Sequence, residues 1–331
     1  MSAVDDRRFG PLFGVAARPG IAVAFDDVLA GLAAAHKHVP SRLLFDDAGS
    51  DLYDQLAELD AYYPGWAEYA LIRDHAGAIA RHVGPHARVL ELGNATCGHQ
   101  SRALLGVLAQ PASYLPIDTC RTHLERGAAR IRADFPDLEI VPVTAEYTQP
   151  FALPPVLHAW RTTLVVLPAA LIGTFEPGAA RSFLAMLRKL AGADGLLLVG
   201  ADATRDPELL ARAYDDEHGV TAAFDKNVLA HLNRTRGATF DLDAFEHRAV
   251  WNSAASRVEL QLVSRIRQVV HIDGQTITLA PGEPITTEHC YKHTPEATRA
   301  LLGAGGWRPR QVFMSTRVPY RLWLCEPLRW A

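Results

Sequence analysis

Short hydrophobic runs alternate with longer amphipathic segments between about residues 66 and 205. The hydrophobic runs predict strands over residues 88–92, 113–117, 139–143, 163–167 and 195–200. The amphipathic segments predict helices over residues 68–83, 100–108, 123–134 and 177–190. Strands of this kind, separated by helices, form a parallel sheet that is covered by helices on both faces.

The end of the chain follows a different pattern. A helix is predicted over residues 294–302, with Pro295 in its first turn and Gly305 after it. Two strands, 311–315 and 320–325, are joined by a short turn and therefore pair antiparallel. Five parallel strands followed by a helix and such a hairpin make the seven-stranded, doubly wound α/β sheet of class I methyltransferases.

Residues 206–290 interrupt the alternation. They begin with a helix over residues 207–214 and continue with strand-like runs at 256–262, 269–272 and 276–279. We expect this α+β insertion and residues 15–65 to form a substrate-binding lobe over the carboxyl ends of the strands. Residues 66–205 and 291–331 would then form the cofactor-binding domain, with the substrate pocket between the two lobes.

The first strand ends at a turn that is typical of cofactor sites. Gly93 allows a ligand to approach the backbone, and the helix that follows offers free amide groups. The turn has neither Gly-x-Gly-x-x-Gly nor Gly-Lys-Ser/Thr, the motifs of dinucleotide and nucleoside triphosphate sites. Acids at the ends of the first and second strands, Glu91 and Asp118, suit a cationic, hydroxyl-bearing ligand such as S-adenosylmethionine. The alternative is an ordinary turn after a strand.

Composition limits the possible partners. The 331 residues are 49% hydrophobic and 21% charged, with a net charge of -4, so we expect a small-molecule substrate and no binding to nucleic acid or membranes. The first residues lack the apolar core that a signal peptide needs, and no run of eighteen apolar residues occurs, so we expect a cytoplasmic protein. The four cysteines form no Cys-x-x-Cys pair, and we expect reduced thiols and no metal.

Several longer runs are specific to one family. They lie at residues 45–53, 62–64, 213–229, 241–247 and 251–253. From about residue 38 to its end, the chain resembles the ergothioneine-pathway histidine Nα-methyltransferases. The resemblance implies a monomeric, two-lobed class I methyltransferase that moves methyl groups from S-adenosylmethionine to the α-amino group of histidine and releases S-adenosylhomocysteine.

The resemblance also implies cofactor ligands. They are Glu91, Gly93, Asn94 and Thr96 at the turn, Asp118 for the ribose, and Glu146 with Tyr147 on the adenine side. The chain departs from the family at Ala95, where the family has a second glycine. A methyl group therefore lies where the backbone of the family meets the cofactor.

The substrate positions implied by the resemblance are changed more strongly. They are Tyr62, Ala169, Thr174, Tyr214, Leu260, Glu288 and Cys290. Tyr214 matches the residue that binds the substrate carboxylate, whereas Thr174 replaces the asparagine that holds the backbone groups of the substrate. Glu288 is kept from the pair that contacts imidazole, and Cys290 replaces its serine partner. The pocket is expected to accept an amino acid with a basic or hydrogen-bond-donating side chain.

Each methyl transfer releases a proton, and Tyr62 and Asp46 are the candidates to accept it. Asp46 replaces a tyrosine of the family. Its short side chain precedes Ala48-Gly49-Ser50, so a role as a helix cap is an equally good interpretation.

These features predict a methyltransferase that acts on the amino group of histidine, of a related or modified amino acid, or of a small amine. Two alternatives remain open. The first is transfer of another part of the cofactor, such as the aminocarboxypropyl group, which would leave methylthioadenosine. The second is a non-catalytic binding protein whose cofactor turn has decayed at Ala95 and Cys97.

Overall fold

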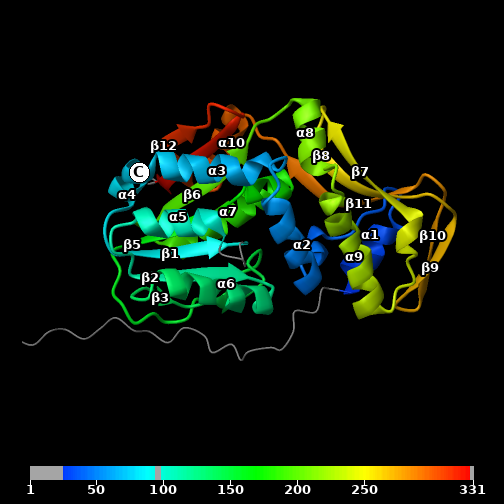
Figure 1. Cartoon of the computed structure of the whole chain (residues 1–331), viewed down its shortest axis with the longest axis horizontal. Helices are drawn as coiled ribbons and strands as arrows, with labels where there is room; N and C mark the ends of the chain where they lie inside the picture. Colours follow the sequence, from blue (N-terminus) through cyan, green and yellow to red (C-terminus); the bar gives the residue numbers. More distant parts are fainter. Residues whose placement is uncertain (1–24, 94–97, 329–331) are drawn as a thin grey trace, which may run out of the picture.

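The computed structural model describes residues 25–93 and 98–328. One half of the molecule is built on a large sheet, and the other half on two smaller antiparallel sheets (Figure 1). The strands of the large sheet are β1 (Ala87–Leu92), β2 (Ser113–Asp118), β3 (Glu139–Ile140), β4 (Val143–Thr144), β5 (Thr162–Leu167), β6 (Leu196–Asp202), β12 (Trp307–Met314) and β13 (Tyr320–Pro327).

The strand order confirms the predicted class I methyltransferase fold. It runs β12-β13-β6-β5-β1-β2-β3, and β4 also pairs with β2. The central strands are parallel, and β13 lies antiparallel between β6 and β12. The predicted third strand is split into β3 and β4. Pro142 lies between them and has no N–H to donate to a neighbouring strand. The sheet therefore has eight strands, with β3 and β4 together in the place of one predicted strand.

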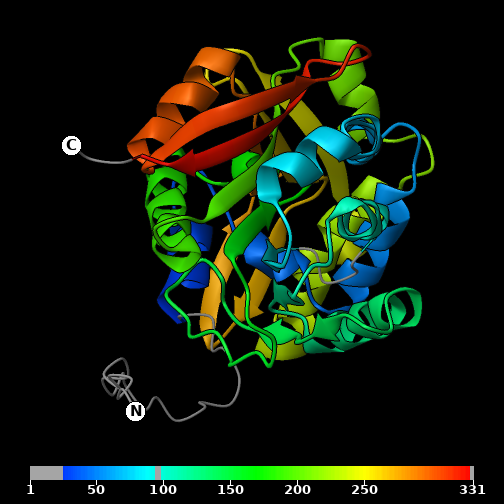
Figure 2. The same ribbon diagram turned by 90° about the vertical axis from the view of Figure 1, so that its left-hand side faces the viewer.

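Helices cover both faces of the large sheet (Figure 2). One face carries α3 (Tyr63–Asp74), α4 (Ala76–Val83), α5 (His99–Val107) and α6 (Arg121–Asp134). The other face carries α7 (Pro177–Ala191) and α10 (Pro295–Ala304). The predicted single helix over residues 68–83 is wrong. Two helices meet at His75, which leaves the helical conformation with φ −115° and ψ 16°.

Alternate strand residues face two hydrophobic cores, one on each side of the sheet. In β6, Leu196 and Leu198 belong to the first core, whereas Leu197 and Val199 belong to the second. All four side chains are buried. This arrangement explains why hydrophobic residues occupy both faces of the central strands.

The second half of the molecule holds the insertion. The strands β7 (Phe245–Asn252), β8 (Arg257–Ser264) and β11 (Pro284–Tyr291) form one sheet, and β9 (Gln268–Ile272) pairs with β10 (Gln275–Leu279). The sequence pattern predicted β8, β9, β10 and the helix α8 (Pro207–Tyr214). It missed β7, β11 and the 17-residue helix α9 (Val220–Arg236).

The N-terminal segment packs on this second half. It contains α1 (Phe25–Ala33), a 3-10 turn (Ser41–Leu44) and α2 (Asp47–Ala57). The helix α2 packs against α9, and His38 forms a parallel bridge with Thr286 of β11. The next helix, α3, packs instead on α5 and β13. These contacts support the division into 15–65 with 206–290 and 66–205 with 291–331, which we keep as a proposal.

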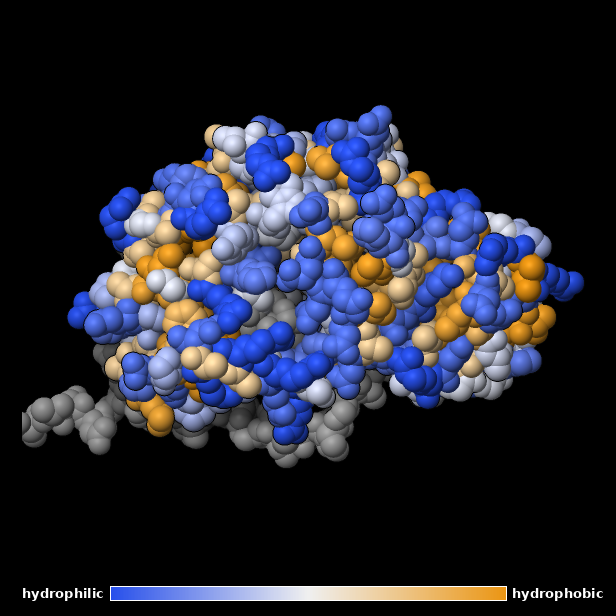
Figure 3. Space-filling view, viewed as in Figure 1, coloured by the Kyte–Doolittle hydropathy of each residue, from blue (hydrophilic) through white to orange (hydrophobic). Residues whose placement is uncertain are grey.

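Hydrophilic side chains cover most of the face shown in Figure 3, and hydrophobic residues are scattered between them. Within residues 25–93 and 98–328, no helix has both the length and the hydrophobicity to cross a bilayer.

Candidate active site

A cavity of about 1460 Å³ lies where the carboxyl ends of β1, β2 and β5 meet the smaller lobe. It brings together residues that are far apart in the sequence. The predicted site residues that line it are Tyr62, Gly93, Asp118, Glu146, Tyr147, Ala169, Thr174, Tyr214, Leu260, Glu288 and Cys290. Asp46 and Glu91 are not among the lining residues, and Asn94 and Thr96 lie outside the described residues.

Gly93 forms a close turn at the end of β1. Its φ is 70°, a left-handed conformation that favours glycine. A Cβ atom here would lie 2.6 Å from Leu171 Cδ2 and 3.0 Å from the Tyr147 hydroxyl. Only glycine therefore fits without displacing the cavity wall. The predicted roles of Asn94 and Thr96, and the effect of Ala95, stay predictions because those residues lie outside the described ranges.

Glu91 lies behind the turn, in the protein interior. Its side chain is 1% exposed and accepts hydrogen bonds from Ser101 Oγ at 3.0 Å and the Tyr114 hydroxyl at 2.6 Å. The carboxylate thus ties β1 to α5 and β2. Its predicted contact with the cofactor stays a prediction.

The remaining cofactor candidates lie on the cavity wall. Asp118 is the last residue of β2, and its Oδ1 accepts the Cys120 N–H at 3.0 Å. Glu146 accepts from the Thr148 hydroxyl at 2.5 Å, and the Tyr147 ring lies 6.2 Å from that of Phe183. These features fit S-adenosylmethionine. The carboxylates can accept from its hydroxyl groups, Tyr147 offers an aromatic face, and Gly93 leaves room beside the backbone.

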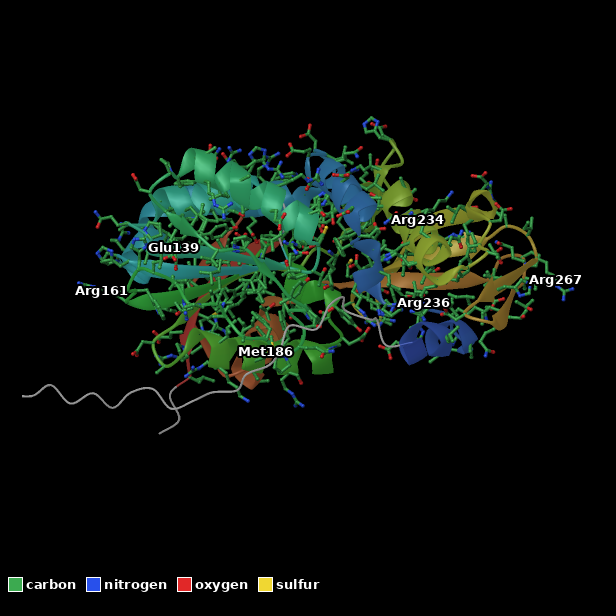
Figure 4. All side chains as sticks on the ribbon, turned by 90° about the horizontal axis from the view of Figure 1, so that it is seen from below. Glu139, Arg161, Met186, Arg234, Arg236 and Arg267 are labelled. Atoms are coloured by element: carbon green, nitrogen blue, oxygen red, sulfur yellow. The ribbon has the colours of Figure 1, made fainter. Side chains whose placement is uncertain are left out.

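Asp46 caps the helix α2. Its Oδ1 accepts the Gly49 N–H at 2.8 Å and the Asn227 amide at 2.7 Å. Arg234, which Figure 4 labels on the smaller lobe, pairs with its other oxygen. Burial disfavours the carboxylate, but these hydrogen bonds, with His231 and Arg234, hold the pKa of Asp46 below its ordinary value. These contacts agree with the interpretation of Asp46 as a helix cap, and we do not include it among the proposed catalytic residues.

Aromatic side chains form the wall beside the substrate positions. The Tyr62 ring lies 6.3 Å from Tyr53 and 6.1 Å from Tyr214, both in edge-on contacts. Burial, and then the neighbouring Tyr53 and Tyr214, raise the pKa of Tyr62 well above its ordinary value. Tyr62 is therefore a neutral hydroxyl that can relay a proton, and not a strong base.

Behind Tyr214 lies a buried ion pair that sequence reasoning missed. Lys292 Nζ is 2.7 Å from Asp202 Oδ2, and the Tyr63 hydroxyl donates to the same oxygen at 2.5 Å. Lys292 also donates to the Tyr214 hydroxyl at 2.6 Å. Burial disfavours the ammonium, but Asp202 raises the pKa of Lys292 above its ordinary value.

This ion pair orients Tyr214. An ammonium group can only donate, so the Tyr214 oxygen accepts from Lys292, and its O–H is directed to Cys290 or to a ligand in the cavity. One sequence signal could have found Lys292. Glu288, Cys290 and Lys292 are spaced by two, and such residues share one face of a strand.

Glu288 supplies the acidic end of the pocket from β11. Cys290 Sγ lies 3.5 Å from its Oε2, and Leu260 faces it on the adjacent strand β8. Burial raises the pKa of Glu288 to about 7, although Cys290 and Lys292 favour its ionised form. Burial and Glu288 also raise the pKa of Cys290, so this thiol is neutral.

The loop after β5 completes the substrate side. Ala169 and Ala170 both have left-handed backbones, with φ 50° and 59°. The Ala169 N–H donates to Glu68 Oε1 at 3.0 Å, and the Tyr320 hydroxyl donates to Glu68 Oε2 at 2.5 Å. Thr174 Oγ donates to the Leu171 carbonyl at 2.9 Å. Its hydroxyl proton is used there, so Thr174 can offer a ligand only an acceptor.

Comparison with known proteins agrees with this geometry. Residues 24–327 match the family of histidine-specific, S-adenosylmethionine-dependent methyltransferases. The histidine N-alpha-methyltransferase of Mycolicibacterium smegmatis is 38% identical over 287 residues, which cover 85% of this chain and 88% of the relative. That of Mycobacterium tuberculosis is 35% identical over 285 residues, which cover 85% of this chain and 87% of the relative. A 4-dimethylallyltryptophan N-methyltransferase of Claviceps fusiformis is 24% identical over 305 residues, with 85% of each chain covered. These matches extend over both lobes.

Proposed function

The chain belongs to the family of histidine-specific, S-adenosylmethionine-dependent methyltransferases, and from this premise we propose that its substrate is histidine or a related amino acid whose side chain donates a hydrogen bond to Glu288. The protein is an amino-acid N-methyltransferase that uses S-adenosylmethionine. The proposal concerns which amino acid it takes and which residues hold it.

The cofactor side of the cavity consists of Gly93, Asp118, Glu146 and Tyr147. When bound there, S-adenosylmethionine supplies an electrophilic methyl group on its sulfonium sulfur. Gly93 leaves room at the turn, Asp118 accepts from hydroxyl groups, and Tyr147 offers its ring. Asn94 and Thr96 remain predicted members of this set.

The substrate side orients an amino acid. Tyr214, fixed by Lys292, donates its O–H to the substrate carboxylate, and Thr174 accepts an N–H of the α-amino group. Two such contacts hold the amine with its lone pair toward the cofactor, and this orientation supplies much of the rate. Tyr62 relays the released proton toward solvent.

One observation carries the choice of substrate. Glu288 is the acid at the pocket end formed by β8 and β11, and its neighbours Leu260 and Cys290 carry no charge at neutral pH. An imidazole N–H gives this acid a stronger donor than the Cys290 thiol alone, whereas a purely aliphatic side chain offers it none, at a cost of about 1–3 kcal/mol. The relatives named for histidine and for 4-dimethylallyltryptophan, both amino acids with a ring N–H, agree with this preference.

The test is a substrate panel with the purified protein and S-adenosylmethionine, followed by mass spectrometry. Histidine and other amino acids with ring N–H groups should be methylated, and S-adenosylhomocysteine should accumulate. In Glu288→Gln the KM should rise roughly 10- to 100-fold with little change in kcat, because a hydrogen bond to a charged group is lost. Preference for aliphatic amino acids, or an unchanged KM in this variant, would contradict the proposal.

The same assay separates the alternatives. Methylthioadenosine in place of S-adenosylhomocysteine would indicate transfer of the aminocarboxypropyl group. The expected monomer, the absence of nucleic-acid binding and the cytoplasmic location stay predictions. Light scattering after gel filtration would test the first of them.

A further inference from the structure

A second cluster of potential ligands lies outside the cavity, between α2 and α6. Asp47 is in the first turn of α2, and Cys120 and His123 are at the start of α6. Cys120 Sγ is 3.1 Å from Asp47 Oδ1 and 3.5 Å from His123 Nδ1, and His123 Nδ1 is 3.9 Å from Asp47 Oδ1. One sulfur, one nitrogen and one oxygen thus surround a common point.

These spacings match a metal centre. With Zn–S near 2.3 Å and Zn–N and Zn–O near 2.1 Å, the ligand atoms of a tetrahedral zinc are roughly 3.3–3.7 Å apart. The observed distances of 3.1, 3.5 and 3.9 Å bracket this range. A mixed set of thiolate, imidazole and carboxylate suits a divalent transition metal such as zinc, and does not suit magnesium or calcium.

The other nitrogen of His123 provides an independent observation. His123 Nε2 is 3.0 Å from Asp51 Oδ1, one helical turn beyond Asp47. The His123 side chain is only 1% exposed. Histidines that bind metals through one ring nitrogen usually donate the other N–H to a carboxylate, which fixes the tautomer and the orientation of the ring. Asp51 is placed for this role.

Arg126 is the one basic side chain at the cluster among the described residues. Its Nη2 is 2.9 and 2.7 Å from the two nitrogens of His123, and 3.1 Å from Asp51 Oδ1. A neutral imidazole can accept at only one nitrogen, so Arg126 cannot bond to both. The guanidinium is about half exposed. It can swing to Asp51 and leave Nδ1 to a metal.

A Cys-His-Asp arrangement also suggests a nucleophile, but the contacts argue against it. The Cys120 thiol donates to Asp47, and burial raises the pKa of Cys120 to about 11. A neutral thiol beside a carboxylate is a poor nucleophile. A bound cation would relieve the repulsion between the thiolate and Asp47.

We propose that Asp47, Cys120 and His123 bind a zinc-like transition metal, with Asp51 orienting His123 and solvent completing the coordination through the exposed side of Asp47. The metal joins α2 of the smaller lobe to α6 of the larger one. The Cys120 N–H donates to Asp118, which lines the cavity. A metal bound to Cys120 therefore stabilises the position of Asp118 from outside the cavity.

The test uses cobalt(II) as a spectroscopic probe with the full chain, after treatment with a chelator. One equivalent should produce a thiolate-to-cobalt charge-transfer band, and zinc should displace it. Cys120→Ser should abolish the band. Cys325→Ala should retain it, because Cys325 lies on β13 and does not belong to the proposed site. Asp51→Asn should retain the band with roughly 10- to 100-fold weaker affinity.

A measurement without variants guards against misfolding of Cys120→Ser. X-ray absorption of the zinc-loaded protein should show one sulfur near 2.3 Å together with lighter ligands near 2.0–2.1 Å. The melting temperature should rise with zinc. Absence of saturable binding, a zinc shell without sulfur, or a band that is kept in Cys120→Ser would overturn the proposal. None of these readouts depends on methyltransferase activity.

Discussion

Ala169 and Ala170 carry unfavourable backbone conformations at the edge of the active site. For an L-residue, a left-handed backbone costs roughly 1–2 kcal/mol. The hydrogen bond from Ala169 to Glu68 holds the loop in place. Strain of this kind persists only where the surroundings compensate for it, as they do here.

Replacing Ala169 by glycine should therefore stabilise the protein. We expect the free energy of unfolding to rise by about 0.5–1 kcal/mol, since relief of strain exceeds the greater freedom of glycine in the unfolded chain. Denaturant titration would measure the change. Ala300→Gly, in the exposed middle of α10, is the matched control and should destabilise by about 1 kcal/mol. A loss of stability in Ala169→Gly would show that the loop is not strained.

Glu288 should make stability depend on pH. Its pKa is raised from 4.5 to about 7 in the folded protein, so the folded state binds its proton more tightly than the unfolded state. Stability is therefore greatest below pH 4.5 for this group and falls as the pH rises to about 7. The change amounts to about 1–3 kcal/mol.

In Glu288→Gln this contribution should disappear. The free energy of unfolding of the wild type, relative to the variant, should decrease between pH 4.5 and 7 in urea titrations. The buried Glu68, whose pKa is also raised to about 7 by burial, contributes equally to both proteins and cancels. A difference that is constant with pH would mean that Glu288 titrates normally.

At the scale of elements, β11 connects the smaller lobe to the active site. Its side chains at Glu288 and Cys290 face the cavity, and Lys292 follows directly after the strand. The Lys292 to Asp202 pair then joins β11 to the end of β6. One ion pair therefore positions Tyr214 and holds the two sheets together.

Breaking this pair should be costly. Lys292→Met leaves the buried Asp202 without its cation and should lower the free energy of unfolding by about 3–5 kcal/mol. The double variant with Asp202→Asn should recover much of the loss. The exposed pair of Arg121 and Glu125 provides the control, and Arg121→Met should leave the free energy of unfolding almost unchanged. Equal effects at the two sites would show that the buried pair has no structural role.

At the scale of the whole molecule, the cavity lies between the lobes, so ligand binding stabilises their arrangement. S-adenosylmethionine at 100 times its Kd should raise the free energy of unfolding by about 2.7 kcal/mol. In Gly93→Ala the shift should be lost, because the new Cβ meets Leu171 at 2.6 Å and φ is positive. Gly178→Ala, where no atom lies within 4 Å of the new Cβ, should keep it. Thermal unfolding with and without the cofactor measures both, and an unchanged shift in Gly93→Ala would remove this turn from the cofactor site.

Local patterns in the sequence determined the large sheet. Its central strands carry hydrophobic residues on both faces because both faces are covered, and Pro177, Pro295 and Gly93 mark helix starts and a turn. The helix α9 was not predicted because its many polar residues leave only a weak helical periodicity of hydrophobic positions. The strand β11 was not predicted because Pro284–Tyr291 mixes polar and apolar residues on both faces. These two elements are stabilised by packing against segments that are distant in the sequence.

The roles of single residues were likewise predicted in part from the sequence and decided in part by the tertiary structure. The resemblance to the family predicted several residues that line the cavity, among them Tyr62, Tyr214 and Glu288. Only the tertiary structure showed that Asp46 also contacts Asn227 and Arg234, that Glu91 is turned into the interior, and that Lys292 meets Asp202. Each depends on a partner far along the chain, and the cluster of Asp47 with Cys120, 73 residues apart, does so as well. A side chain's neighbours in space decide its charge and its role, and the order of residues alone does not specify them.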